Sequence, residues 1–273
     1  MKNKIFALFM TTCMCVGMLG TIVFASDGVG VSDNHSDLAN GGARPTMTRL
    51  ALTVNTGLID APTETVEEQL AALETSDLTA EQKAVAYEKL TQEGSAKEVT
   101  SRAATTWSYL DGFMIWKQSE SYYCVPASCK AAMNYLTGSS DSQATIANAM
   151  GTTTSGTPFA NAKTYLNNNQ SSNTYISRDY DTALSTLQTN LYSAINTYNA
   201  PPLISVKLST ANGWAYDTSG HTMLISGARS DKEEFRVADP YIQWEDSSAN
   251  MFYSKSSSAI RTAIYNRGNG YIF

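Results

Sequence analysis

QSESYYCVPASCKAAMNYL, residues 118–136, marks the point where an aromatic, extended run gives way at Cys124 to a helical pattern. Pro126 suits the first turn of that helix, where its missing N–H is not needed. A thiol at a helix N-terminus lies at the positive end of the helix dipole, which favours the nucleophilic thiolate. The alternative interpretation of Cys124 is a small, buried apolar side chain. Cys129, inside the same helix, is interpreted as a packing residue.

The chain around this helix divides into helical patterns followed by strand patterns. We expect helices over 124–136, 142–150, 157–166 and 181–198, and strands over 202–208, 221–228, 235–238 and 251–253. Helices first and an antiparallel sheet second is an α+β arrangement, in which the helix that begins at Cys124 packs on the sheet. Because aromatic and β-branched residues rise from Trp107 onward, we place one domain at 106–273.

Two polar residues flank the predicted strands of that sheet. His221 opens the apolar run in GHTMLISGA, residues 220–228, and Asp239 closes the next strand in VADPY, residues 237–241. If the two strands are antiparallel neighbours, both side chains lie at the same end of the sheet, and the carboxylate can hold the imidazole tautomer. Taken singly, a structural histidine and an ordinary Asp-Pro turn remain the alternatives.

Gln118 lies six residues before Cys124. Its side-chain amide is a candidate donor to the oxyanion that forms when a thiolate attacks a carbonyl, together with a backbone N–H at the helix start. The alternative is an exposed glutamine at the end of a strand.

These segments, in the chain order Gln, Cys, His, Asp, resemble the bacteriocin-processing, double-glycine-leader peptidase family and its secreted relatives. The resemblance covers about residues 106–260 and implies a papain-like cysteine peptidase fold and hydrolysis of peptide or amide bonds through an acyl-enzyme. It assigns Cys124 as the nucleophile, His221 as the base, Asp239 as its partner and Gln118 as the oxyanion donor. Family members often carry glycine where Val125 stands, so we expect a different substrate. The membrane domain and ATPase of the transporter-fused members are not found in this sequence, so peptide export is not implied.

The first 25 residues have the features of a secretory signal peptide. Lys2 and Lys4 precede an apolar run that ends in Val23-Phe24-Ala25, which predicts cleavage after Ala25 and a secreted protein. The alternative is a retained membrane anchor, because the apolar run approaches the length that spans a bilayer.

Residues 26–105 are interpreted as a flexible N-terminus, two short helices joined near Ser76, and a linker that contains Arg102. Two roles remain open for this region. It is either a pro-region whose helices cover the cleft until the linker is cut, or a simple spacer.

The composition, with 42% hydrophobic and 16% charged residues, is that of a globular protein. Without the two lysines of the signal peptide, 25 acidic residues face 17 basic ones, a net charge of −8 that argues against nucleic acid and anionic lipid as partners.

Cys124 and Cys129 on one helix have Cα atoms about 8 to 9 Å apart, too far for a disulfide. Histidines and cysteines are too few for an ordinary zinc site. We therefore expect no metal or cofactor. The resemblance to the peptidase family implies a peptide or protein substrate, and we expect a monomer. The alternatives are a catalytically silent binding protein on the same scaffold and a cysteine amidase or acyltransferase.

Overall fold

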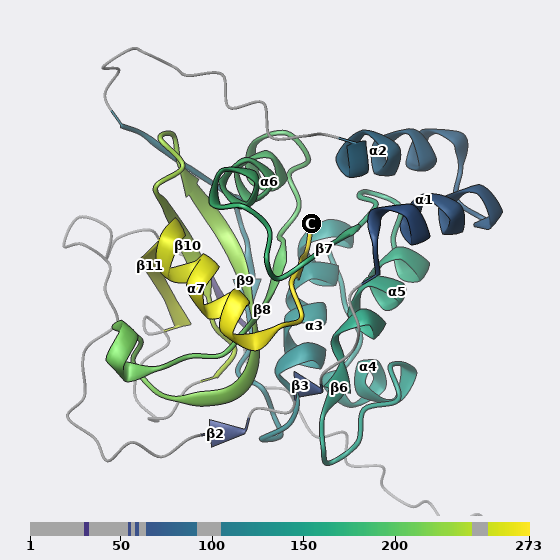
Figure 1. Cartoon of the computed structure of the whole chain (residues 1–273). Coiled ribbons are helices and arrows are strands. Elements are labelled where there is room, and N and C mark those ends of the chain that lie inside the picture. Colours follow the sequence, from purple (N-terminus) through teal and green to yellow (C-terminus); the bar gives the residue numbers. More distant parts are fainter. Residues whose placement is uncertain (1–29, 33–53, 56–57, 60–63, 92–104, 242–250) are drawn as a thin grey trace, which may run out of the picture.

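The computed structural model describes residues 30–32, 54–55, 58–59, 64–91, 105–241 and 251–273. Within these residues, helices α3, α4 and α5 form one half of the molecule and an antiparallel sheet forms the other (Figure 1). This confirms the predicted α+β class. The predicted signal peptide, most of the polar segment after it, and the predicted linker up to residue 104 lie outside the described residues.

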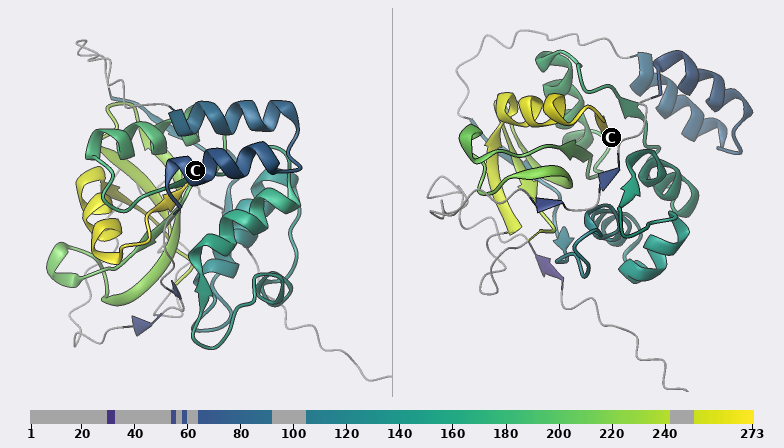
Figure 2. Two further views of the ribbon diagram at one scale, coloured as in Figure 1. Left: turned by 45° about the vertical axis from the view of Figure 1, so that its right-hand side comes forward. Right: turned by 60° about the horizontal axis from the view of Figure 1, so that its bottom comes forward.

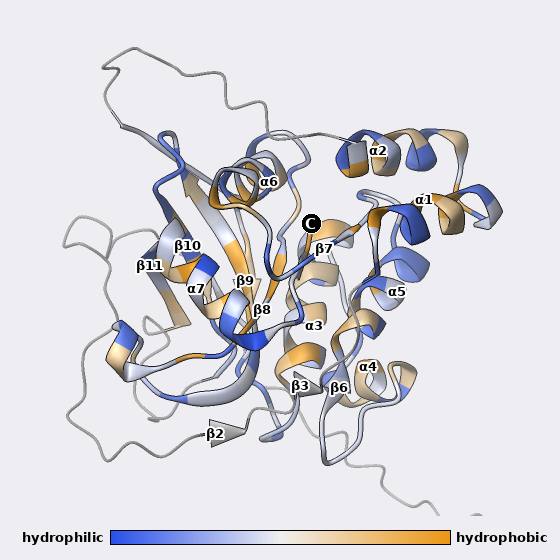
Figure 3. Cartoon of the chain, viewed as in Figure 1, coloured by the Kyte–Doolittle hydropathy of each residue, from blue (hydrophilic) through white to orange (hydrophobic). Residues whose placement is uncertain are grey.

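The helical half is built around α3 (Cys124–Thr137), whose first ten residues are all buried. Figure 3 shows the apolar character of this helix, which suits a position between the other helices and the sheet. The helix ends at Gly138, whose φ of 78° lies in the left-handed region that glycine adopts without strain. Helices α4 (Gln143–Ala149) and α5 (Phe159–Asn169) both pack against it.

The sheet has the strand order β11-β10-β9-β8-β12-β7, with β4 and β2 also paired to β9. Its strands are β2 (Val54–Asn55), β4 (Trp107–Tyr109), β7 (Ser177–Arg178), β8 (Leu203–Val206), β9 (Thr218–Arg229), β10 (Glu234–Ala238), β11 (Phe252–Ser256) and β12 (Tyr271–Ile272). Residues 220–228 of β9 are all buried, so this strand is covered on both faces. Helix α3 contacts β9, and α6 (Leu184–Asn196) and α7 (Ser257–Arg267) contact each other and the sheet. A short 3₁₀ helix, η2 (Thr210–Asn212), precedes β9.

The N-terminal region contributes more than two helices to the described structure. Helices α1 (Val66–Thr75) and α2 (Ala80–Thr91) form an antiparallel hairpin at one end of the molecule (Figure 2). Before them, β1 (Val31–Ser32) pairs with β5 (Met114–Ile115), and β3 (Leu58–Ile59) pairs with β6 (Thr157–Pro158). None of the described helices combines the length and the apolar character that a membrane span requires.

Most predicted elements are present, with shifted ends. The strand of His221 begins at Thr218, so His221 is its fourth residue and does not open it. The helix expected from residue 157 begins at Phe159, because residues 157–158 pair with β3 instead. Helix α7 was not predicted, although its buried residues Ile260, Ala263 and Ile264 have the spacing of one helix face.

Candidate active site

His221 and Asp239 form the best-defined contact of the site. Both side chains are fully buried, and His221 Nε2 lies 2.8 Å from Asp239 Oδ1. Asp239 directly follows β10, which is the antiparallel neighbour of β9. The predicted pairing of the two strands is therefore confirmed, and it brings the imidazole and the carboxylate to the same end of the sheet.

Three further hydrogen bonds hold the Asp239 carboxylate. Oδ1 accepts from the backbone N–H of Tyr241 at 2.9 Å. Oδ2 accepts from the hydroxyl groups of Tyr216 at 2.8 Å and Tyr253 at 3.0 Å. Together with His221 these donors replace the water that a buried carboxylate loses. The carboxylate is thus fixed in position from the loop before β9, from the turn after β10 and from β11.

The surroundings of His221 favour its protonated form. Burial by itself would lower the pKa of the imidazole. The charge and hydrogen bond of Asp239, with a smaller contribution from Cys124, outweigh burial and raise the pKa from 6.5 to about 9. The ring is therefore an imidazolium at neutral pH, ready to give up a proton.

Cys124 is the first residue of α3 and is fully buried. The helix start has neither a side-chain cap from Tyr123 nor an acidic residue in its first turn, so the positive end of the helix dipole faces the thiol. His221 Nδ1 makes no hydrogen bond of ordinary geometry within the described residues. Cys124 is nevertheless near enough to be one of the causes that raise the His221 pKa. The structure thus brings thiol and imidazole together, in a looser geometry than that of His221 and Asp239.

Gln118 is buried, which excludes the alternative of an exposed strand end. Its Nε2 donates to the carbonyl oxygens of Glu120 and Ser121, both at 2.9 Å, so both amide hydrogens are directed at the loop that leads to Cys124. Its Oε1 is buried and has no hydrogen-bond partner among the described residues. Donation to an oxyanion would require Nε2 to leave one of these carbonyls, so in this structure Gln118 shapes the loop before the nucleophile.

A second glutamine, which the sequence did not single out, holds the same loop. Gln143 on α4 is fully buried, and its Nε2 donates to the carbonyl of Lys117 at 2.8 Å. Its Oε1 accepts from the N–H of Ser119 at 3.0 Å. The two bonds fix the backbone on both sides of Gln118.

Comparison with protein families gives a match over this whole region. The sequence model of the peptidase C39-like family matches residues 110–266. The chain belongs to the peptidase C39-like family. The match spans Gln118, Cys124, His221 and Asp239 and agrees with a papain-like cysteine peptidase scaffold.

Other comparisons give less. No curated protein matches the sequence. Among solved structures, the chain is similar to the peptidase domain of Streptococcus ComA, a bi-functional ABC transporter involved in quorum sensing. The two are 15% identical, with a TM-score of 0.39, and the match covers 59% of this chain and 96% of that one.

The other thiol among the described residues of this C39-like chain has a different environment from Cys124. Cys129 is fully buried inside α3, with its Sγ 4.0 Å from Met150 Sδ. Burial first, and then the charge of Cys124, raise its pKa, which keeps the thiol neutral and unreactive. Within the described residues, Cys124 and Cys129 form no disulfide. In the part of the chain that the structure describes, no group of three or more His, Cys, Asp or Glu side chains is placed to hold a metal ion.

Tyr216 and Tyr253, like Gln143, are residues of this C39-like site that sequence reasoning missed. The chain has 15 tyrosines, and nothing local marks these two as partners of Asp239. Their role becomes visible only when the loop before β9 and strand β11 are folded against the end of β10.

Proposed function

We propose that this protein is a cysteine peptidase that hydrolyses peptide bonds with Cys124 as nucleophile, His221 as acid and base, and Asp239 as the group that orients His221. The observation that supports this most is the buried hydrogen bond of His221 Nε2 to Asp239. It leaves Nδ1 as the ring nitrogen that faces Cys124, since Nδ1 has no other hydrogen-bond partner among the described residues. A thiol, an imidazole and a carboxylate in that order are the groups that nucleophilic catalysis requires.

In the first half of the reaction, the Cys124 thiolate attacks the carbonyl carbon of the scissile bond. The tetrahedral intermediate collapses as the C–N bond breaks, and the His221 imidazolium gives its proton to the leaving amine. An acyl-enzyme thioester and a neutral imidazole remain. Because the pKa of His221 is raised to about 9, the ring carries the required proton at neutral pH.

In the second half, neutral His221 takes a proton from water, which attacks the thioester. The C–S bond breaks, the acid product leaves, and the thiolate and imidazolium are restored. The negative oxygen that forms in both halves lies next to the start of α3, where backbone N–H groups without helical partners can stabilise it. Gln118 can add a donor there only after its amide leaves Glu120 or Ser121.

The test is covalent labelling with a peptide that carries a cysteine-reactive electrophile, followed to completion and mapped by mass spectrometry. Wild type and the matched control Cys129→Ala should carry the adduct on Cys124, and Cys124→Ala should carry none. Hydrolysis of unstructured casein should disappear in Cys124→Ala alone. Equal labelling of Cys124→Ala and wild type would exclude Cys124 as nucleophile. Labelling of Cys124 with no hydrolysis in any variant would favour a silent binding protein or an acyltransferase.

We also propose that the protein is exported and loses residues 1–25. The proposal rests on the lysines, apolar run and Ala25 of the signal-like segment. N-terminal sequencing of protein recovered from the medium should begin at Ser26, and an intact Met1 on membrane-bound protein would support a retained anchor instead.

A further inference from the structure

The catalytic groups of the proposed peptidase are closed off from solvent. Cys124, His221 and Asp239 each have 0% of their surface exposed. Burial suits Asp239, but a nucleophile must reach a substrate carbonyl. The described structure is therefore a closed state of the site, and something in the chain has to move before a substrate can enter.

The N-terminal region occupies the edge of the sheet next to His221. In β2, Val54 pairs with Thr218 and Asn55 pairs with Gly220, in parallel with β9. Gly220 is the residue immediately before His221. The backbone of β2 thus takes the strand edge that lies beside the proposed base.

The same region also pairs with the helical half. In β3, Leu58 pairs with Thr157 and Ile59 with Pro158, in parallel with β6. Strand β6 leads directly into α5, which packs on α3. Only two residues separate Asn55 from Leu58, and three peptide steps reach at most about 11 Å. One short stretch of chain therefore connects the half that carries His221 to the half that carries Cys124.

We propose that β2 and β3, together called the strap, close the catalytic cleft by occupying the backbone edges on which a substrate peptide would bind. This inference rests on the proposed peptidase function and adds its substrate class and its regulation. A peptide that adds to a strand edge is held by main-chain hydrogen bonds, which any extended sequence can form. The substrate class is accordingly an extended, unfolded polypeptide, which competes with the strap for the edges at Gly220 and Thr157.

The helical hairpin does not itself cover the cleft, contrary to the expectation for a pro-region made of helices. Lys89 of α2 donates to Asn173 Oδ1 and to the carbonyl of Thr174. The neighbouring Ser172 donates to the carbonyl of Leu136, near the C-terminal end of α3. Cys124 lies at the other end of that helix, about 18 Å away at 1.5 Å per residue. The hairpin is an anchor that holds the strap from a distance.

The anchor begins five residues after the strap. Glu64 forms an ion pair with Lys163 of α5. Gln69 of α1 makes two hydrogen bonds to the backbone of Ser177 in β7, at 2.7 and 3.0 Å. Arg178 Nη2 donates to the carbonyl of Lys89 at 2.6 Å, near the end of α2. The hairpin that follows the strap is therefore bound to both halves of the catalytic domain, through α5 and through β7.

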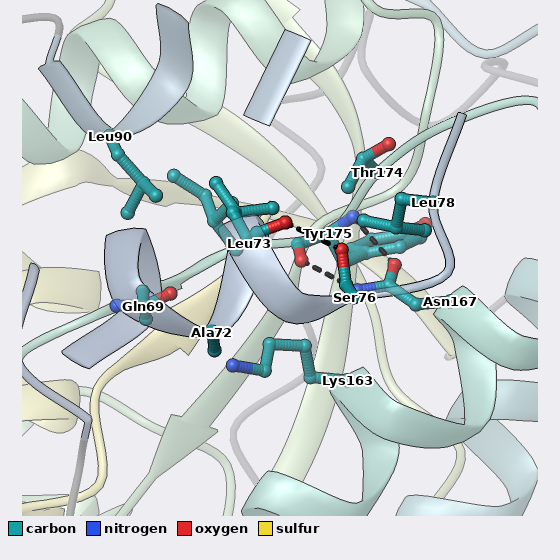
Figure 4. Close-up of a pocket in the computed structure, with 11 residues that line it drawn as sticks. Gln69, Ala72, Leu73, Ser76, Leu78, Leu90, Lys163, Asn167, Thr174 and Tyr175 are labelled. Atoms are coloured by element: carbon teal, nitrogen blue, oxygen red, sulfur yellow. Dashed lines mark hydrogen bonds between the residues drawn. The ribbon is translucent and has the colours of Figure 1, made fainter. Parts of the chain in front are cut away.

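The packing beneath the anchor is incomplete, as expected for a contact that can be released. A pocket of about 130 Å³ lies between the hairpin and the catalytic domain, next to α5 and residues 174–176. Figure 4 shows Leu73 and Leu90 on the hairpin side, with Asn167 and Tyr175 on the other. The pocket wall is mostly apolar. Because the space is not filled, these apolar atoms lack contacts that they would make in a fully packed interface.

Proline substitutions in the strap test the inference in the full chain. Asn55→Pro and Leu58→Pro each remove a backbone N–H and disfavour pairing. The measurement is the rate at which iodoacetamide alkylates Cys124, with Cys129 in the core of α3 as internal control. Each variant should raise the Cys124 rate about three- to tenfold, since each lost ladder bond favours the open strap by about that factor. Ser32→Pro is the matched control, because β1 pairs with β5 instead, and it should behave as wild type.

Three results would overturn the strap. The first is an unchanged Cys124 rate in both strap variants. The second is an equal rise at Cys129, which would mean that the whole core had opened. The third is an equal rise in Ser32→Pro, which would remove the special role of β2 and β3. A faster Cys124 rate without casein hydrolysis in any variant would leave the strap standing and reject the peptidase function, so the two proposals fail separately.

Discussion

Replacing Asp239 by asparagine removes the negative charge beside His221 while keeping the shape of the side chain. An amide oxygen can still accept from His221 Nε2, and the amide nitrogen can donate to the hydroxyl oxygens of Tyr216 and Tyr253. The ring should therefore keep its orientation. What changes is the proton affinity of the imidazole, because the charge of Asp239 is the first of the causes that raise it.

The size of the change follows from the balance at His221. Its pKa is raised from 6.5 to about 9 although burial lowers it, so without Asp239 the pKa should fall to 6.5 or below. At pH 7.5 the imidazolium fraction then drops from nearly all to about one tenth or less. The rate of acylation at this pH should drop about tenfold from protonation alone, with a further loss where the tautomer is less well held.

Two measurements check this prediction. The alkaline limit of kcat/KM should lie near pH 9 in wild type and at least two pH units lower in Asp239→Asn. The imidazole resonances of His221 should titrate in the same way by NMR, in a background with His35→Gln, which removes the only other histidine. An alkaline limit that stays near pH 9 in Asp239→Asn would refute the reasoning, because it would show that a group other than Asp239 raises the pKa of His221.

Two further predictions concern the supports of the site. Tyr253→Phe removes one of the hydroxyl donors to Asp239 and should cost about 1 to 3 kcal/mol of stability. It should also change the His221 titration by NMR, because the carboxylate that raises the His221 pKa loses one of its hydrogen bonds. Tyr265→Phe, at a half-exposed position, should change neither, and an unaltered His221 titration in Tyr253→Phe would contradict a positioning role. Burial lowers the pKa of Lys89 to about 7 from 10.5, so the docked hairpin binds fewer protons than the free one between these values, and docking should strengthen as pH rises from 7 to 10.5. The protection factors of the α1 and α2 amides, which compare the observed exchange rate with the intrinsic rate at the same pH, should rise over that range in wild type but not in Lys89→Met. The same pH dependence of the protection factors in both proteins would remove Lys89 as its source.

The sequence predicts α3 well because its signals are local. Pro126 and the change from aromatic to helical texture lie within a few residues of Cys124, and the helix begins at that residue. The strands β9 and β10 are also visible as apolar runs. Their antiparallel pairing follows from short connection length, which is how His221 and Asp239 come to meet.

Gln118 shows where such reasoning ends. Its distance from Cys124 along the chain is compatible with an oxyanion donor, but side-chain direction is set by the loop it belongs to. The carbonyls of Glu120 and Ser121 point at its amide, and Gln143 from α4 holds that loop in place. A spacing in sequence cannot show which of several acceptors an amide will face.

The sequence by itself determined most of the elements and the chemistry available to them: a thiol at the start of a helix, a histidine on one strand, an aspartate directly after the next strand, and two helices ahead of them. The tertiary structure decided which groups support Asp239, where Gln118 points, and that β2 and β3 lie on the edges of β9 and β6. The reason is physical. Helical and strand periods are properties of neighbouring residues, whereas a hydrogen bond from Tyr253 or a strand added at Gly220 joins segments far apart in the chain, and its formation depends on how whole elements pack.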